Sequence, residues 1–288
     1  MSIVAELGDS RIVTLPQGPV RIYDRGSGPT IVFVHGLFAN AAAWRKVVPL
    51  LADSFRCITA DWPFGAHRLP MTEAADLTPI GIANVIADVI EELDLREVTL
   101  VGNDGGGMLC QLVVAYRRER LQRLVLTPCD AYENFPPHMF DYLCWAAKTP
   151  GLMPVVGRAL RVDAIRTSFG RSRLGFGGLS RDRVPTAVID HYLYGLAHSA
   201  GVVRDTVKFL RAVDNRRTLD AARHFPAIAQ PVLVAWAPDD LFFPFDHAQR
   251  FANDFPNARL ETVANSRTWV AEDQPERVAS LIADFVLA

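Results

Sequence analysis

The residues best suited to chemistry lie in segment 98–107, Val-Thr-Leu-Val-Gly-Asn-Asp-Gly-Gly-Gly. An apolar run ends in a turn of small residues with Asp104 at its centre, and a helical pattern follows. A strand–turn–helix of this kind lifts the central side chain out at the end of a sheet, where the helix N-terminus favours a negative charge. We therefore predict a catalytic role for Asp104. The alternative is an ordinary glycine-rich turn in which Asp104 caps the helix.

Two other apolar runs end in residues that could support such a carboxylate. Segment 31–38, Ile-Val-Phe-Val-His-Gly-Leu-Phe, ends in a His-Gly pair, and His35 is interpreted as a hydrogen-bonded scaffold residue. Segment 231–244, Pro-Val-Leu-Val-Ala-Trp-Ala-Pro-Asp-Asp-Leu-Phe-Phe-Pro, ends in two adjacent acids, Asp239 and Asp240. A capping or turn role explains Asp239.

The hydrophobic pattern predicts the elements that position these segments. Short apolar runs predict strands at 11–15, 20–23, 31–35, 57–60, 98–102, 124–127, 232–236 and 260–263. Apolar stripes at 3–4 spacing predict helices between them, such as 82–93 and 278–285. This alternation predicts an α/β fold with a mostly parallel sheet that begins with two antiparallel strands.

The alternation stops between residues 133 and 219. This stretch contains helical patterns at 140–148, 184–196 and 202–213 but no convincing strand. We therefore predict a core formed by residues 1–132 and 220–288, with residues 133–219 inserted as a helical cap.

Composition excludes several classes of protein. The 288 residues carry a formal net charge of −2, so no basic surface for nucleic acid is expected. No run of about 18 apolar residues predicts a membrane span. The four cysteines lack metal or disulfide spacing, and the N-terminus lacks a secretory pattern. We expect a cytoplasmic protein without metal whose partner is a small-molecule substrate. The oligomeric state stays open.

The three segments, in this order, resemble an α/β-hydrolase with an aspartate nucleophile, and the resemblance spans nearly the whole chain. It implies a mostly parallel eight-stranded sheet with a helical cap. Asp-elbow members include epoxide hydrolases, haloalkane dehalogenases and fluoroacetate dehalogenases. The resemblance implies that Asp104 attacks carbon and that the backbone N–H groups of Leu37 and Gly105 stabilise developing charge. It further implies that Asp240 is the supporting acid and that no cofactor is needed.

One position departs from this family. In segment 260–277 the family histidine falls on Thr268, whose hydroxyl cannot act as a base near neutral pH. Three interpretations remain. His67 could serve as a surrogate base. Asp104 could transfer protons, either in a lyase, isomerase or cyclase or in hydrolysis by direct attack of water. The protein could also be a ligand-binding module on a retired hydrolase scaffold.

The substrate class can be narrowed by the same comparison. Haloalkane and fluoroacetate dehalogenases carry Trp or Arg directly after the nucleophile, whereas this chain has Gly105. Epoxide hydrolases use cap tyrosines to protonate the ring oxygen. We therefore expect an epoxide hydrolase-like enzyme acting on a small, largely apolar molecule. Candidate cap and pocket residues are Tyr142, Tyr192, Tyr194 and Trp269.

Overall fold

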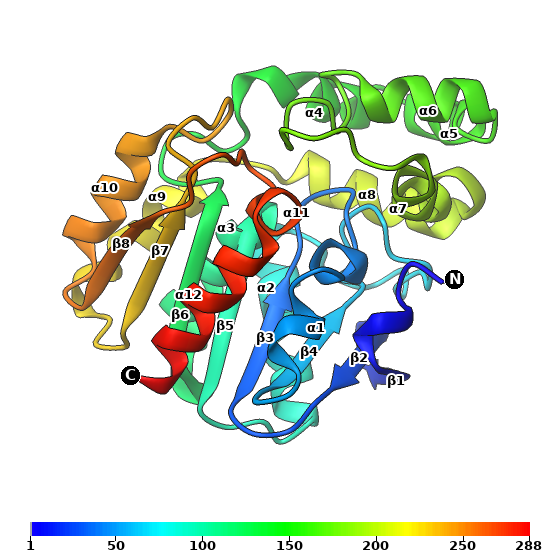
Figure 1. Ribbon diagram of the computed structural model, residues 1–288. Coiled ribbons are helices and arrows are strands. Elements are labelled where there is room, and N and C mark those ends of the chain that lie inside the picture. Colours follow the sequence, from blue (N-terminus) through cyan, green and yellow to red (C-terminus); the bar gives the residue numbers. More distant parts are fainter. Residues whose placement is uncertain (1) are drawn as a thin grey trace.

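A single sheet of eight strands forms the centre of the protein, in the order β1-β2-β4-β3-β5-β6-β7-β8 (Figure 1). The computed structural model describes residues 2–288. The strands are β1 (Asp9–Leu15), β2 (Gly18–Arg25), β3 (Thr30–Val34), β4 (Arg56–Ala60), β5 (Val98–Asp104), β6 (Leu121–Cys129), β7 (Val232–Trp236) and β8 (Ala258–Thr262).

The pairing of the strands confirms the predicted fold class. β2 pairs antiparallel with β1 and with β4, and all the other neighbours are parallel. The eight predicted strands and the antiparallel start are therefore present. The carboxyl ends of the parallel strands share one edge of the sheet, so residues that follow different strands meet there.

Helices cover both faces of the sheet because the central strands are apolar on both sides. In β3, Val32 and Val34 face one hydrophobic cluster, and Ile31 and Phe33 face the other. The first cluster contains residues of α2 (Pro79–Glu92), α3 (Gly105–Tyr116), α9 (Arg216–Ala222) and α10 (Phe245–Asp254). The second contains residues of α1 (Val48–Leu51), α11 (Val270–Asp273) and α12 (Pro275–Leu287).

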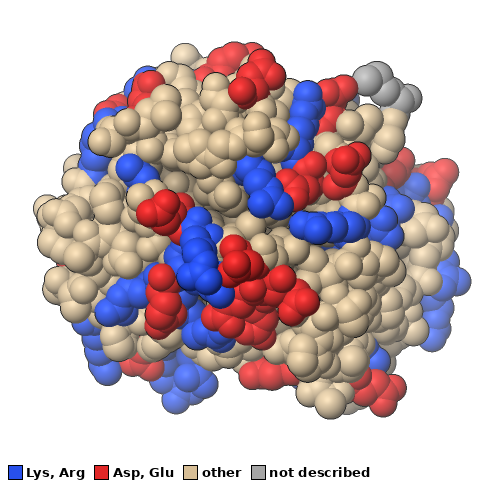
Figure 2. Space-filling view, turned by 90° about the horizontal axis from the view of Figure 1, so that it is seen from below, with Lys and Arg blue, Asp and Glu red and all other residues tan. Residues whose placement is uncertain are grey.

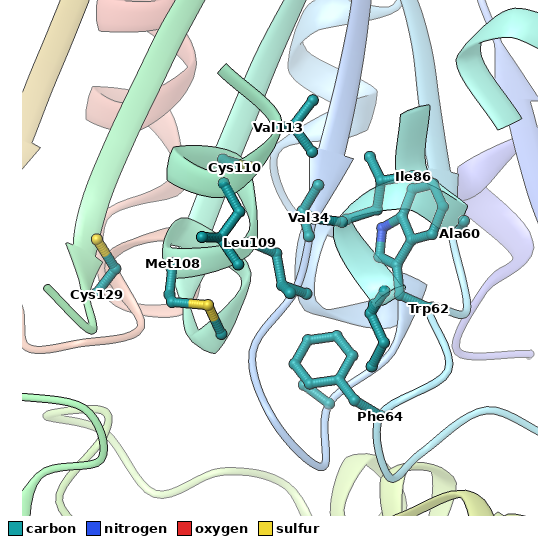
Figure 3. Packing of buried hydrophobic residues seen from close by; sticks show 14 of the residues in the cluster. Val34, Ala60, Trp62, Phe64, Ile86, Met108, Leu109, Cys110, Val113 and Cys129 are labelled. Carbon is teal, nitrogen blue, oxygen red and sulfur yellow. The ribbon is translucent and has the colours of Figure 1, made fainter. Parts of the chain in front are cut away.

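The larger cluster packs directly beneath the turn at the end of β5. Figure 3 shows Leu109 and Val113 of α3 beside Val34 of β3, with Trp62 and Phe64 from the loop after β4 nearby. All five side chains are fully buried. The turn at Asp104 therefore rests on a close-packed base, which limits its movement.

Of the six α-helices between β6 and β7 in the chain, the first five lie above the carboxyl edge of the sheet (Figure 1). They are α4 (Asp141–Lys148), α5 (Leu152–Ala159), α6 (Asp163–Arg171), α7 (Thr186–His198) and α8 (Ala200–Arg211). The sequence pattern predicted α4, α7 and α8. It missed α5, whose eight residues include Pro154 and Gly157, and α6, in which only Gly170 is buried. The limits 133–219 of a cap stay a prediction; α9, at their end, packs against α3 of the core.

The face opposite these helices carries charges of both signs side by side (Figure 2). Ion pairs such as Arg117 with Asp88 and Glu91 contribute to this mixture across the molecule. Among the helices of residues 2–288, none is long and apolar enough to cross a bilayer.

Candidate active site

Asp104 lies at a sharp turn between β5 and α3. Its backbone has φ 56° and ψ −135°, a region that residues with a Cβ rarely adopt. Across the sheet, Asp104 is in register with Cys129 at the end of β6, after an irregularity in the ladder between Gly102 and Asp104. The predicted strand–turn–helix is therefore present, and the Asp104 side chain leaves the sheet at its carboxyl edge.

Close backbone packing explains the small residues around this turn. A Cβ on Gly106 would lie 2.3 Å from the carbonyl oxygen of His35, and one on Gly107 would lie 2.3 Å from Cβ of Cys129. A Cβ on Gly36 would lie 2.3 Å from Oδ2 of Asp104. Neighbouring strands thus hold the turn on both sides, and the loop after β3 touches the Asp104 carboxylate itself.

A mostly apolar cavity of about 60 Å³ lies over Asp104, between the sheet edge and the helical insertion. Core residues such as Leu37 and Gly105 form its floor, and its walls come from the insertion. The polar side chains in its lining are Asp104, Asp130 and Cys144, and among residues 2–288 no His, Lys or Arg lines it. The wall residues include Phe140, Leu143, Phe169, Phe176, Phe209 and Leu210.

This environment raises the pKa of Asp104 to about 7. Burial is the largest cause, since a charge is poorly solvated beside apolar walls, and the negative charge of Asp240 adds to it. Two hydrogen bonds oppose the rise, from the backbone N–H of Gly105 and from the Trp269 side chain. The Gly105 nitrogen is 2.7 Å from Oδ1 of Asp104. Near neutral pH, the carboxyl group is thus present in both protonation states.

The loop after β7 places Asp240 against Thr268. Thr268 Oγ1 donates a hydrogen bond of 2.8 Å to Oδ2 of Asp240, and Thr268 is fully buried. The backbone N–H groups of Phe242 and Phe243 donate to Oδ1 of Asp240 at 2.7 and 2.8 Å. Burial raises the pKa of Asp240, and these three hydrogen bonds oppose the rise. The Thr268 hydroxyl therefore forms the hydrogen bond to Asp240, but it cannot accept a proton as a histidine would.

The backbone of Leu37 lies close to Gly105, whose N–H donates to Asp104. The Leu37 nitrogen is 3.5 Å from the position of a Cβ on Gly105, and within residues 2–288 it has no acceptor. His35 takes no part in the cavity. It accepts a hydrogen bond from the Trp62 backbone N–H at its Nε2, and burial lowers its pKa to about 3. It is thus a neutral scaffold residue.

His67 does not line the cavity. Its Nε2 is 3.2 Å from Oδ2 of Asp205 in α8, and both side chains are buried. Asp205 also accepts from the Met71 backbone N–H at 2.7 Å and from Arg204. The structure therefore joins His67 to the helical insertion rather than to the elbow.

Of the four aromatic candidates, one reaches the Asp104 carboxyl group. Trp269 is close enough for its side chain to lower the pKa of Asp104, and its ring packs against Phe176 and edge-on against Tyr192. Tyr142 donates a hydrogen bond to the carbonyl oxygen of Leu174, and Tyr194 is exposed beneath the guanidinium of Arg68. None of the three tyrosines lines the cavity.

Asp130 is a lining residue that the sequence analysis missed. It directly follows β6, is 5% exposed, and has an Oδ1 with no hydrogen-bond partner within residues 2–288. Burial and the charge of Asp104 raise its pKa well above the usual value. The sequence feature that could have identified Asp130 is an acidic residue directly after an apolar strand. The sequence could not show that this strand lies next to β5.

Known proteins share both sequence and fold with this chain. Residues 29–275 match the family model described as alpha/beta hydrolase fold. A 2-hydroxy-6-oxononadienedioate/2-hydroxy-6-oxononatrienedioate hydrolase of Cupriavidus pinatubonensis is 25% identical, covering 98% of this chain and 97% of its own. Haloalkane dehalogenase 2 of Mycobacterium tuberculosis is 26% identical, with 96% and 94% covered. The solved structure of the epoxide hydrolase CorEH superposes with TM-score 0.78 at 17% identity, covering 96% of this chain and 98% of that one, a likeness of fold.

Proposed function

Because this chain belongs to the alpha/beta hydrolase fold family, we propose that it is an enzyme acting on a small, largely apolar organic molecule through Asp104. One observation carries the proposal: the Asp104 carboxyl group is held at a strained turn, faces an apolar cavity, and has a pKa of about 7. A carboxyl group with a pKa near the working pH is suited to proton transfer. Hydrolysis is the reaction named for its relatives.

Proton transfer fits this cavity better than covalent attack. An ester on Asp104 would need an activated water for its release, and no lining residue within 2–288 offers a basic nitrogen. Thr268, which donates its hydroxyl to Asp240, cannot replace one. In our proposal, the Asp104 carboxylate takes a proton from water as the water oxygen bonds to an electrophilic carbon of the substrate. Opening of an apolar epoxide is the hydrolysis that fits this scheme.

A single turnover in water enriched in oxygen-18 tests the mechanism. Excess enzyme is mixed with an apolar epoxide such as styrene oxide, and the diol is analysed by mass spectrometry. Direct attack puts oxygen-18 into the diol and leaves the Asp104 peptide unlabelled. Asp104→Asn should reduce turnover at least 100-fold, because an amide has no basic oxygen to accept the proton. Unlabelled diol with a labelled Asp104 peptide would contradict direct attack.

Covalent attack by Asp104 is the second candidate. The N–H groups of Leu37 and Gly105 favour it, since they could stabilise charge on an oxygen at the elbow. The expected sign is a persistent mass adduct on the peptide that contains Asp104. If wild-type protein binds apolar epoxides without turning them over and without an adduct, the enzyme proposal fails and the ligand-binding interpretation gains.

A further inference from the structure

We propose that Asp104 and Asp130 form a pair of carboxyl groups that shares one proton, with Asp130 as the acid that protonates the leaving oxygen of the substrate. The inference deepens the proposed function and rests on it. It assigns a catalytic role to Asp130 and names the substrate class as an apolar molecule with one oxygen acceptor, such as an epoxide.

The sheet brings the two carboxyl groups to one place. Asp104 is in register with Cys129, so Asp130 follows directly after the residue that pairs with Asp104. Both side chains line the same cavity. Oδ2 of Asp130 is 3.7 Å from the position of a Cβ on Gly105, the residue whose N–H binds Asp104. A molecule in the cavity therefore meets both carboxyl groups.

Within residues 2–288, the charged form of Asp130 is favoured only by a hydrogen bond from its own backbone N–H. The Gln111 side chain donates to the main-chain oxygen of Asp130 at 2.8 Å, which leaves the carboxyl group free. Its Oδ1 is buried without a partner, and no cation lines the cavity within residues 2–288. An isolated buried carboxylate is costly, whereas a protonated one is a hydrogen-bond donor that can serve a substrate oxygen.

The surroundings of the pair decide which member holds the proton. Burial and then the Asp104 charge raise the pKa of Asp130 well above that of an ordinary carboxyl group. Asp104 keeps hydrogen bonds from Gly105 and Trp269 that favour its charged form, although Asp240 opposes this. The other titratable neighbours are the thiols of Cys129 and Cys144, whose pKa values burial raises. Near neutral pH, Asp104 is thus the base and Asp130 the acid.

The proposed step balances within this pair. The Asp130 proton moves to the epoxide oxygen as the ring C–O bond breaks. A water oxygen bonds to the same carbon, and a water proton moves to Asp104. The product is a diol, with Asp104 protonated and Asp130 ionised. Transfer of one proton from Asp104 to Asp130 then restores the starting state, and no other reactant is needed.

Reciprocal titration tests the pairing without any substrate. Protein with carbon-13 in its aspartate carboxyl groups is titrated by NMR as wild type, Asp130→Asn and Asp104→Asn, with each resonance assigned by its loss in one variant. Asp104→Asn should raise the acid dissociation constant of Asp130 at least tenfold, because a neighbouring negative charge is lost. Asp130→Asn should instead lower the acid dissociation constant of Asp104, because it removes the carboxyl proton that stabilises the Asp104 anion. Asp53→Asn, on the exposed surface, should change neither. Independent titration of the two groups would overturn the pair. If one variant misfolds, the wild-type curve of the residue assigned by the other variant still tests it.

Turnover separates failure of the pair from failure of the proposed function. Asp130→Asn should reduce epoxide opening at least 100-fold, and Asp130→Glu should restore part of it. If Asp130→Asn is fully active while Asp104→Asn is inactive, the pair is overturned and the function of Asp104 stands. If wild-type protein opens no epoxide but the titrations are reciprocal, the pair stands and the proposed reaction fails.

Discussion

At the scale of single residues, Asp104 is placed in the candidate site, and its burial there lowers the free energy of unfolding when its carboxyl group is ionised. Its carboxyl group has a pKa of about 7, against an ordinary value of 3.8, because the apolar cavity solvates its charge poorly. The unfolded chain therefore releases this proton at lower pH than the folded protein does. The contribution of Asp104 to the free energy of unfolding is retained below about pH 4 and is lost as the pH rises towards 7.

We therefore expect Asp104→Asn to stabilise the protein at pH 8 while it abolishes activity. The asparagine oxygen can keep the hydrogen bond from the Gly105 N–H, and the variant buries no charge. The gain should be about 4 kcal/mol at pH 8 and close to zero at pH 4, since the pKa is raised from 3.8 to about 7 and one pKa unit corresponds to about 1.4 kcal/mol. Urea unfolding at the two pH values measures it. A loss of stability at pH 8 would show that the ionised carboxylate is well solvated.

At the scale of elements, the elbow depends on how closely α3 and β3 approach. The N-terminus of α3 passes so near the end of β3 that Gly106 has backbone oxygens of Val34 and His35 within 2.4 Å of a Cβ position. The neighbouring Gly105 has more room, and its nearest contact would be Phe64 at 3.3 Å. Close packing therefore requires glycine at position 106, whereas position 105 has room for a Cβ.

Gly106→Ala should lower the free energy of unfolding by about 3 kcal/mol, because neither contacting backbone can yield without disturbing the sheet. Gly105→Ala is the matched control in the same helical turn, and it should change stability by less than about 1 kcal/mol. Thermal unfolding followed by circular dichroism compares the two variants. Equal losses would mean that crowding against β3 is not what fixes the turn.

At the scale of the whole molecule, buried polar contacts join the helical insertion to the core. Asp205 of α8 lies beside His67 and accepts from the backbone N–H of Met71, both in the loop between β4 and α2. Asp205 is fully buried, and His67 and Arg204 lower its pKa despite that burial. This contact joins the insertion to the core at His67.

Asp205→Ala should destabilise the protein by about 3 kcal/mol, since it leaves His67 and the Met71 N–H buried without a partner. His67→Ala should also lower the unfolding free energy. The double variant should lose less than the sum of the two, because both changes remove the same contact. Urea unfolding of the four proteins gives the coupling. Strictly additive losses would contradict a shared contact, and loss of turnover in His67→Ala with unchanged stability would support the surrogate-base interpretation instead.

Features that are local in the chain could be predicted from the amino-acid sequence. Apolar runs and stripes located the eight strands and the main helices, because strand and helix periods are read within a few residues. The small residues around Asp104 similarly predicted the elbow, since a tight turn leaves no room for larger side chains. The change of pattern after β6 predicted the helical insertion.

Contacts between side chains that are distant in the chain could not be predicted in this way, because they depend on the packing of the fold. Asp130 joins Asp104 because β6 lies beside β5, and strand order cannot be read from either strand alone. Thr268 meets Asp240 through two separate loops, and His67 meets Asp205 138 residues further along the chain. These contacts arise from packing the insertion and the late strands onto the sheet. A carboxyl group's neighbours, and hence its pKa, are therefore set by the fold rather than by local sequence.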